Sequence, residues 1–214
     1  DYFTHQSMKG RPDLWEDGAL IEREGYLTDL LSDRAVDFVR QCGEGGNPFL
    51  LSLHYTAPHW PWETRDDAHV PATLDGAIQH ADGGSIHIYR RMVEHMDEGI
   101  GRLMGELDRL RLADDTLIVF TSDNGGERFS DNWPLIGGKM DLTEGGIRVP
   151  YVVRWPARIG AGQACATPVI TMDWAATFLA AANVAEHRDY PMDGVSLVPM
   201  LEDPAGVVLD RGLF

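Results

Sequence analysis

Hydrophobic and polar residues follow two different spacings along this chain, and these spacings predict alternating helices and strands. Apolar side chains recur at helical spacing, as on one face of an amphipathic helix, over residues 26–41, 85–110 and 172–182. Short, almost entirely apolar runs, typical of buried strands, cover residues 49–55, 117–121 and 149–155. Since helices and strands alternate, we expect an α/β fold with a mixed, largely parallel central sheet flanked by helices.

Polar segments rich in glycine and proline separate these elements. Residues 57–84 and 125–147 are expected to be loops, and long loops within a compact domain are usually functional. Ser85 is placed to cap the long second helix, and Thr171 to cap the last one. The polar face of the second helix is expected to carry Glu94, His95, Asp97 and Glu98.

Composition narrows the class of protein. With 43% hydrophobic and 24% charged residues, the chain is typical of a globular protein. The formal net charge of −16 disfavours nucleic acid or an anionic membrane as the main partner, and it agrees with cation binding. No run reaches the ~18 apolar residues of a membrane span. Cys42 and Cys165 lie far apart without CxxC spacing, so free thiols are expected and a disulfide is the lesser alternative.

The two ends of the sequence do not resemble the ends of a domain. Asp1-Tyr2-Phe3 begins without an apolar leader segment, and Leu213-Phe214 closes the chain on apolar residues. We therefore expect residues 1–214 to be one incomplete domain. Apolar surface that the rest of the domain would cover is then expected to promote self-association. The sequence does not indicate a cellular compartment.

The most informative motif follows the apolar run 117–121. Ser122 ends this run, Asp123 and Asn124 come next, and Gly125-Gly126 follow them. Open α/β sheets tend to place ligands at the carboxyl ends of their strands. Carboxylate and amide oxygens are the donors that a hard divalent cation takes, whereas the same residue types also form ordinary turns. A cation site and a plain strand-to-turn junction are therefore the two interpretations of this motif.

Two further motifs also follow predicted strands. His59 lies between Pro58 and Pro61, which stiffen its backbone, and an imidazole can act as acid, base or anion-binding donor near neutral pH. Lys139 lies between two glycine pairs and would offer a compact positive charge to a tetrahedral oxyanion. The alternatives are a histidine packed on Trp60 and an ordinary surface lysine. The pattern of a P-loop, GxxxxGK[ST], does not occur.

Taken together and in this order, the motifs resemble the sulfatases of the alkaline-phosphatase-like superfamily. The matching segments are Ala57-Pro58-His59-Trp60-Pro61, Thr121-Ser122-Asp123-Asn124-Gly125-Gly126, Gly138-Lys139, Glu144-Gly145-Gly146-Ile147-Arg148-Val149-Pro150 and Asp193-Gly194-Val195-Ser196-Leu197. They extend over about residues 26–214. The resemblance implies an alkaline-phosphatase-like fold, incomplete here, and the hydrolysis of sulfate monoesters.

The resemblance also implies a role for each matching residue. Asp123 and Asn124 resemble two ligands of the family's divalent cation, usually Ca²⁺. Lys139 resembles the lysine that contacts the sulfate oxygens, and His59 the histidine that contacts sulfate and protonates the leaving oxygen. These roles suit the chemistry, because charge builds on the sulfuryl oxygens and on the leaving group. Arg148 is expected to form a structural ion pair instead.

Several parts of the family's site have no counterpart in the sequence. The formylglycine nucleophile, made within a C/S-x-P-x-R motif, is expected in an N-terminal segment that this chain lacks, as are two metal-binding aspartates. The small C-terminal sheet domain of the family is missing as well. The chain alone is therefore expected to be inactive and to bind a cation weakly or not at all, because calcium typically takes six to eight oxygen ligands.

The resemblance leaves two other functions open. A phosphatase or phosphonate monoester hydrolase of the same superfamily is one, since phosphate and sulfate are both tetrahedral oxyanions. A non-catalytic binding protein that keeps half of the site is the other. The loops 60–84 and 127–136 are expected to determine which substrate is accepted, and no residue pattern within them identifies it.

Overall fold

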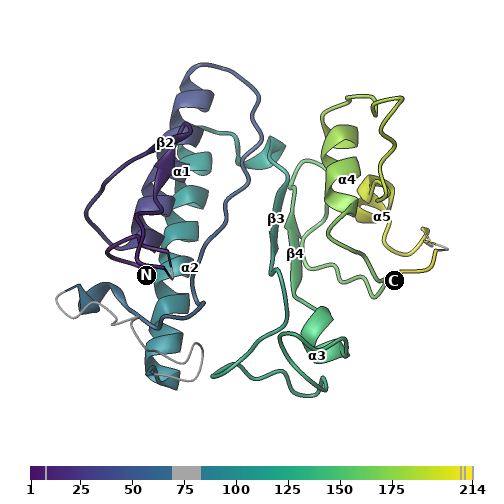
Figure 1. Cartoon of the computed structure of the whole chain (residues 1–214). Coiled ribbons are helices and arrows are strands. Elements are labelled where there is room, and N and C mark those ends of the chain that lie inside the picture. Colours follow the sequence, from purple (N-terminus) through teal and green to yellow (C-terminus); the bar gives the residue numbers. More distant parts are fainter. Residues whose placement is uncertain (8, 69–82, 208, 210, 214) are drawn as a thin grey trace. The chain divides into compact units, whose positions relative to one another are not determined.

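The chain forms two compact units in a computed structural model that describes residues 1–7, 9–68, 83–207, 209 and 211–213 (Figure 1). Unit 1 comprises Asp1–Leu112 and Ser122–Val149, and unit 2 comprises Ala113–Thr121 and Pro150–Phe214. The chain therefore leaves unit 1, enters unit 2, returns to unit 1 and ends in unit 2. The segment Ser122–Val149, with most of the predicted site, belongs to unit 1.

Two long helices form the framework of unit 1. Helices α1 (Leu27–Glu44) and α2 (Ile86–Arg109) pack against each other (Figure 1), which confirms both predicted helices. Helix α1 runs further than expected and includes Gly43, where a side chain would lie 2.9 Å from the side chains of Leu110 and Leu112. Glycine is thus tolerated in the last turn because it lets the end of α2 approach closely.

Helix α2 begins as predicted. The Ser85 hydroxyl oxygen accepts a hydrogen bond from the backbone N–H of Ile88 at 3.2 Å. Ser85→Ala is expected to lower the free energy of unfolding of unit 1 by about 1 kcal/mol, because the partly buried N–H of Ile88 loses its acceptor. Ser85→Asp keeps an acceptor and should stay within about 0.5 kcal/mol of the wild type. Urea denaturation followed by circular dichroism measures both, and equal stability of wild type and Ser85→Ala would contradict the cap.

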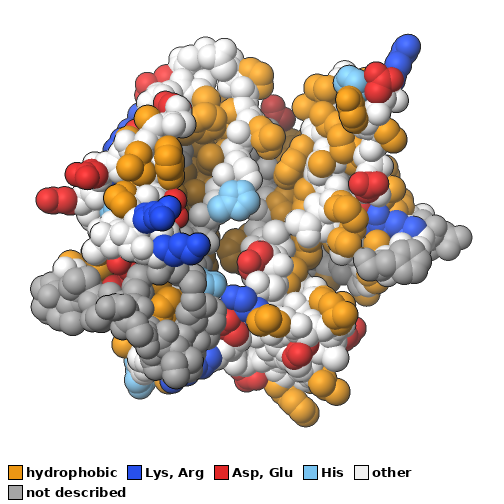
Figure 2. Space-filling view, in the orientation of Figure 1, with side chains coloured by type: hydrophobic (Ala, Val, Ile, Leu, Met, Phe, Trp, Pro, Cys, Tyr) orange, Lys and Arg blue, Asp and Glu red, His pale blue; other side chains and the backbone are white. Residues whose placement is uncertain are grey.

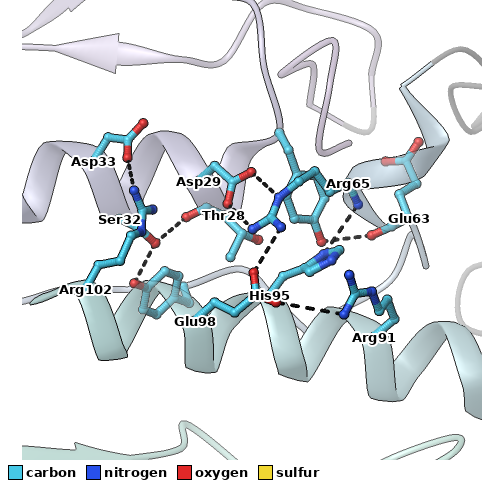
Figure 3. Close-up of polar contacts among 12 residues, drawn as sticks. Thr28, Asp29, Ser32, Asp33, Glu63, Arg65, Arg91, His95, Glu98 and Arg102 are labelled. Carbon is cyan, nitrogen blue, oxygen red and sulfur yellow. Dashed lines mark hydrogen bonds and ion pairs between the residues drawn. The ribbon is translucent and has the colours of Figure 1, made fainter.

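The predicted polar face of α2 is wrong at His95, which is fully buried, whereas Glu94, Asp97 and Glu98 are exposed as expected. The imidazole meets the edge of Tyr26, with ring centres 5.6 Å apart, and its Nδ1 accepts the Arg65 N–H at 3.4 Å (Figure 3). Burial, and then the charges of Arg65 and Arg91, lower the pKa of His95. His95 is therefore a polar residue that is buried because α2 packs on Tyr26 and on the loop after residue 57.

The run 49–55 was predicted to be a buried strand, and this prediction is wrong: no described residue pairs with it in a strand ladder. The side chains do alternate between half-buried and exposed from Leu51 onward, as in a strand. One side rests on α1, where Phe49 meets Phe38 and the Tyr55 hydroxyl lies 2.8 Å from Ser32 Oγ. The periodicity is present, but a strand also requires a hydrogen-bonded neighbour.

The rest of unit 1 is largely loop. Strands β1 (Trp15–Glu16) and β2 (Ala19–Leu20) pair antiparallel, a 3-10 helix spans Arg65–Asp67, and α3 (Glu144–Ile147) is a single turn within the predicted glycine-rich loop. The core joins the N-terminus, the start of α1, the loop after residue 56 and α2. It consists of Tyr2, Tyr26, Ala57, Trp60, Trp62 and Met92.

Unit 2 is built on one strand pair. Strands β3 (Ile118–Thr121) and β4 (Tyr151–Arg154) match the predicted runs and pair antiparallel, with Ile118 opposite Arg154 and Thr121 opposite Tyr151. Pro150 precedes β4, as expected for a residue without a backbone N–H. The α/β class is therefore confirmed, while the largely parallel sheet stays a prediction, because all strand pairs in the described residues are antiparallel.

Two helices complete unit 2: α4 (Asp173–Ala181), at the position predicted for the last helix, and the short α5 (Val198–Glu202). Trp174, Leu197 and Met200 are buried between them and the strands. The predicted Thr171 cap is wrong, since the N-cap of α4 is Met172 and no side chain caps it. Both cysteines are free, as expected. Across the described part of the chain, no helix is long and apolar enough to cross a membrane.

Candidate active site

The four residues predicted to carry chemistry, His59, Asp123, Asn124 and Lys139, all lie in unit 1. Asp123 and Asn124 lie just beyond the end of β3, separated from it by Ser122, as the sequence predicted. The backbone N–H of Lys139 donates to the Gly126 carbonyl at 3.0 Å, so the lysine segment is joined directly to this turn. His59 is linked to them through its loop, which carries Trp62. The Trp62 and Phe129 rings meet edge to face at 5.0 Å.

The turn at Asp123 and Asn124 is held by glycines that fit against one another. The Gly125 N–H donates to the Gly146 carbonyl at 2.8 Å. A Cβ added to Gly125 would lie 1.8 Å from the Gly145 carbonyl oxygen, and one added to Gly145 would lie 2.1 Å from the Gly137 oxygen. No side chain fits at such separations. The glycine pairs that looked like generic turn residues in the sequence are thus a close-packed support for the site.

Asn132 reinforces this support, and sequence reasoning missed it. Its side-chain amide donates both hydrogens, one to the Gly126 carbonyl at 3.0 Å and one to the Gly137 carbonyl at 3.1 Å. The amide thus links the turn after β3 to the glycine pair before Lys139. An asparagine in a polar loop gives no signal of such a role, because turns favour it at many positions.

Asp123 and Asn124 present oxygen atoms in different settings. The Asp123 carboxylate is exposed. The Asn124 side-chain nitrogen donates to the Gly125 carbonyl at 2.8 Å, which leaves Oδ1 as the atom of that amide suited to a cation. These donors fit a hard divalent cation in type, but they are two. Within residues 1–7, 9–68 and 83–207, no group of three or more His, Cys, Asp or Glu side chains could hold a metal ion. The turn therefore fits half of a cation site.

Lys139 is held near this turn by an acidic neighbour. Its ammonium nitrogen lies 3.2 Å from Glu127 Oε2, and both side chains are only about one-fifth exposed, at 21% and 23%. The pair keeps the positive charge close to the glycine support. A tetrahedral anion at this point would compete with Glu127 for the ammonium group.

The tautomer of His59 follows from its neighbour. His59 Nδ1 lies 2.6 Å from the Trp60 carbonyl oxygen, and a carbonyl can only accept, so Nδ1 carries a hydrogen. In a neutral ring with this tautomer the lone pair is on Nε2. The backbone of the residue is fixed on both sides, since its N–H donates to Thr56 and its carbonyl accepts from the Tyr2 hydroxyl, each at 2.9 Å.

Other predicted features have mixed outcomes. Arg148, the residue after α3, forms the expected ion pair, with Glu144 at 3.3 Å. Part of the expected specificity loop 60–84 lies outside the described residues. Hydrophobic side chains gather on the surface around α3 (Figure 2), and four of them are more than three-quarters exposed. These are Trp133, Ile136, Met140 and Leu142. Self-association through such surface stays a prediction.

Comparisons with known proteins agree with the motifs. The family model described as Sulfatase matches residues 1–184. The mouse (Mus musculus) steryl-sulfatase is 36% identical over 206 residues, which is 90% of this chain and 31% of that protein. The crystal structure of Ps i-CgsB matches with a TM-score of 0.78 at 32% identity, over 94% of this chain and 47% of that one. A structure of that protein in complex with k-i-k-neocarrahexaose matches with a TM-score of 0.75.

A more distant likeness concerns the fold alone. The phosphonate monoester hydrolase SpPMH from Silicibacter pomeroyi matches with a TM-score of 0.59 at 22% identity, over 89% of this chain and 46% of that one. The chain spans about a third of the length of the curated relatives it matches.

Proposed function

The chain belongs to the sulfatase family, and from this premise we propose that it provides part of a site that hydrolyses sulfate monoesters. The observation that carries the proposal is the joining of Lys139 to the Asp123–Asn124 turn through the shared Gly126 carbonyl. This arrangement brings a turn whose oxygen donors suit a cation and a positive side chain to one glycine support. Both are groups that an oxyanion needs as its charge increases.

Two residues of this chain would act on the ester directly. The Lys139 ammonium would bind the sulfuryl oxygens and balance their growing negative charge. His59 would act as the general acid in its protonated form. Because Nδ1–H is held on the Trp60 carbonyl, the proton that passes to the leaving oxygen comes from Nε2. The imidazole is then neutral, with its remaining hydrogen on Nδ1.

The Asp123 carboxylate and Asn124 Oδ1 would hold a hard divalent cation, which takes oxygen ligands, and we propose calcium, the usual cation of the family that the motifs resemble. When bound, such a cation supplies positive charge next to the sulfuryl oxygens. We propose that further ligands and the formylglycine nucleophile come from sequence outside this chain, since no C/S-x-P-x-R motif occurs in it. The isolated chain is therefore expected not to turn over an aryl sulfate.

Lys139→Ala tests the proposal in the full-length product of the gene. We expect kcat/KM for 4-nitrophenyl sulfate to fall about 100-fold, because one charge that stabilises the transition state is removed. Arg148→Ala is the matched control, since it removes a positive charge from a nearby exposed ion pair and should change kcat/KM by less than about threefold. Full activity of Lys139→Ala would refute the role of this lysine.

The same assay separates the alternatives. Faster turnover of 4-nitrophenyl phosphate or of a phenylphosphonate monoester than of the sulfate would favour a phosphatase or phosphonate monoester hydrolase. Failure of the full-length product to cleave all three would favour a non-catalytic binding protein.

A further inference from the structure

Tyr2 is a buried residue near the start of the chain, distant in sequence from the motifs of the site. It nevertheless contacts one of them, the segment of His59. Its side chain is 1% exposed and belongs to the core of unit 1. The hydroxyl donates to the carbonyl of His59 at 2.9 Å. A buried hydroxyl that bonds the backbone of a predicted catalytic residue is a candidate for holding that residue in place.

Two further contacts fix Tyr2 itself. Its backbone N–H donates to Glu63 Oε2 at 2.9 Å, and Glu63 is 3% exposed. Its ring stacks on Tyr26, with centres 5.3 Å apart and planes inclined by 23°. Tyr26 in turn donates its hydroxyl to the Glu63 carbonyl at 2.9 Å. The two stacked tyrosines therefore hold the loop 59–63 by hydrogen bonds at both of its ends, at His59 and at Glu63. Glu63 is labelled in Figure 3.

The hydroxyl is a durable donor. Burial, together with the neighbouring Tyr26 and the charge of Glu63, raises the pKa of Tyr2 well above its ordinary value. The proton therefore stays on the oxygen throughout the neutral range. His59, by contrast, is exposed. The bond from Nδ1–H to the Trp60 carbonyl holds its ring.

We propose that Tyr2 is a positioning residue for His59. Its hydroxyl fixes the carbonyl of His59, and its backbone N–H is bonded to the Glu63 carboxylate at the other end of the loop. This keeps Nδ1 aligned with the Trp60 carbonyl and Nε2 available for proton transfer. The contribution of this alignment to catalysis rests on the proposed function, whereas the effect of Tyr2 on the His59 tautomer does not.

The test follows the ring nitrogens of His59 by two-dimensional ¹H–¹⁵N NMR of the whole chain. The wild type should show a single Nδ1–H pattern at neutral pH. Tyr2→Phe removes the hydroxyl but keeps the ring, and we expect loss of that single pattern as the Nε2–H form becomes populated. Tyr55→Phe is the control, because it removes another hydroxyl contact of unit 1, the one with Ser32, and should leave the pattern intact. An unchanged pattern in Tyr2→Phe overturns the proposal.

If Tyr2→Phe does not fold, a second pair of variants tests the positioning role of Tyr2. Glu63→Leu removes the acceptor of the Tyr2 N–H, and Glu63→Gln keeps an oxygen there. We expect Glu63→Leu to lose the single-tautomer pattern and Glu63→Gln to restore it; identical patterns in both overturn the proposal.

Hydrolysis of 4-nitrophenyl sulfate by the full-length product separates this inference from the proposed function. If that product does not cleave the sulfate while Tyr2→Phe still loses the single pattern, the function fails and the positioning role stands. If it cleaves the sulfate while Tyr2→Phe keeps the pattern, the positioning role fails and the function stands.

Discussion

Gly125→Ala is expected to lower the free energy of unfolding of unit 1 by about 3–4 kcal/mol, because its new Cβ would overlap backbone atoms. The Gly145 carbonyl oxygen would lie 1.8 Å away, and the Gly146 Cα 2.8 Å away. Neither can turn aside as a flexible side chain would. Relief requires the segment with α3 to move away from the turn, which breaks the bond from the Gly125 N–H to Gly146. The same displacement would pull the two predicted cation ligands away from Lys139.

Hydrogen exchange measured by mass spectrometry checks this prediction unit by unit. Protection should fall in α1, α2 and the segment 122–149 while α4 keeps its protection. Gly101→Ala and Gly105→Ala are matched controls in α2, since no atom lies within 4 Å of either added Cβ. Alanine favours a helix over glycine by up to about 1 kcal/mol, so both controls should stabilise unit 1. Wild-type protection in Gly125→Ala would show that the glycine contact is not a constraint.

Asp173→Ala is expected to lower the free energy of unfolding of unit 2 by about 3–5 kcal/mol, because it leaves a largely buried arginine without its counter-charge. Asp173 is fully buried. Its carboxylate accepts from both terminal nitrogens of Arg211, and also from the backbone N–H groups of Ile170 and Val195 at 2.9 Å and 3.0 Å. One side chain thus connects the start of α4 to two later segments of unit 2.

An exposed ion pair of the same unit provides the comparison. Arg158 and Glu202 are 40% and 39% exposed, and Glu202→Gln should cost less than about 1 kcal/mol. Urea denaturation followed by hydrogen exchange in α4 measures both variants. If Asp173→Ala were no more destabilising than Glu202→Gln, the buried pair would contribute little to unit 2.

Acid should affect unit 2 through the same carboxylate. Burial alone would raise the pKa of Asp173, but the hydrogen bonds from Arg211, Ile170 and Val195 outweigh it, so the pKa is lowered. A lowered pKa in the folded state means that the unfolded chain binds the proton more readily. The contribution of this group is therefore complete at neutral pH and is lost as pH falls below about 4. Asp173→Asn should flatten that part of the stability curve.

Local patterns predicted the elements that depend on local chemistry. The runs around β3 and β4 were found because short runs of apolar, β-branched residues bounded by turn residues are typical of strands. Ser85 was found because a cap is defined within four residues of sequence. The sequence likewise predicted that Asp123, Asn124 and Lys139 lie between these two strands. Their roles as ligands and anion-binding groups stay proposals.

What the sequence could not show depends on contacts between distant segments. His95 looked like a polar helix residue, and only the packing of α2 against Tyr26 and Arg65 makes it buried. The segment 49–55 has strand periodicity without a strand partner in the described chain. The bond from Tyr2 to His59 spans 57 positions of sequence and leaves no periodic signal. Each of these results from tertiary structure overriding local preference.

The strand pair of unit 2 also affects how much chain entropy is lost when the loop that carries Asp123, Asn124 and Lys139 is ordered. Thr121 and Tyr151 face each other in the β3–β4 register, so the intervening chain, with its glycine pairs and Lys139, is a loop closed at its base. Closing a flexible loop of this size costs about 3 kcal/mol of chain entropy. The β3–β4 hydrogen bonds offset part of that cost. A substitution that frays these strands should therefore loosen the site without touching any residue in it.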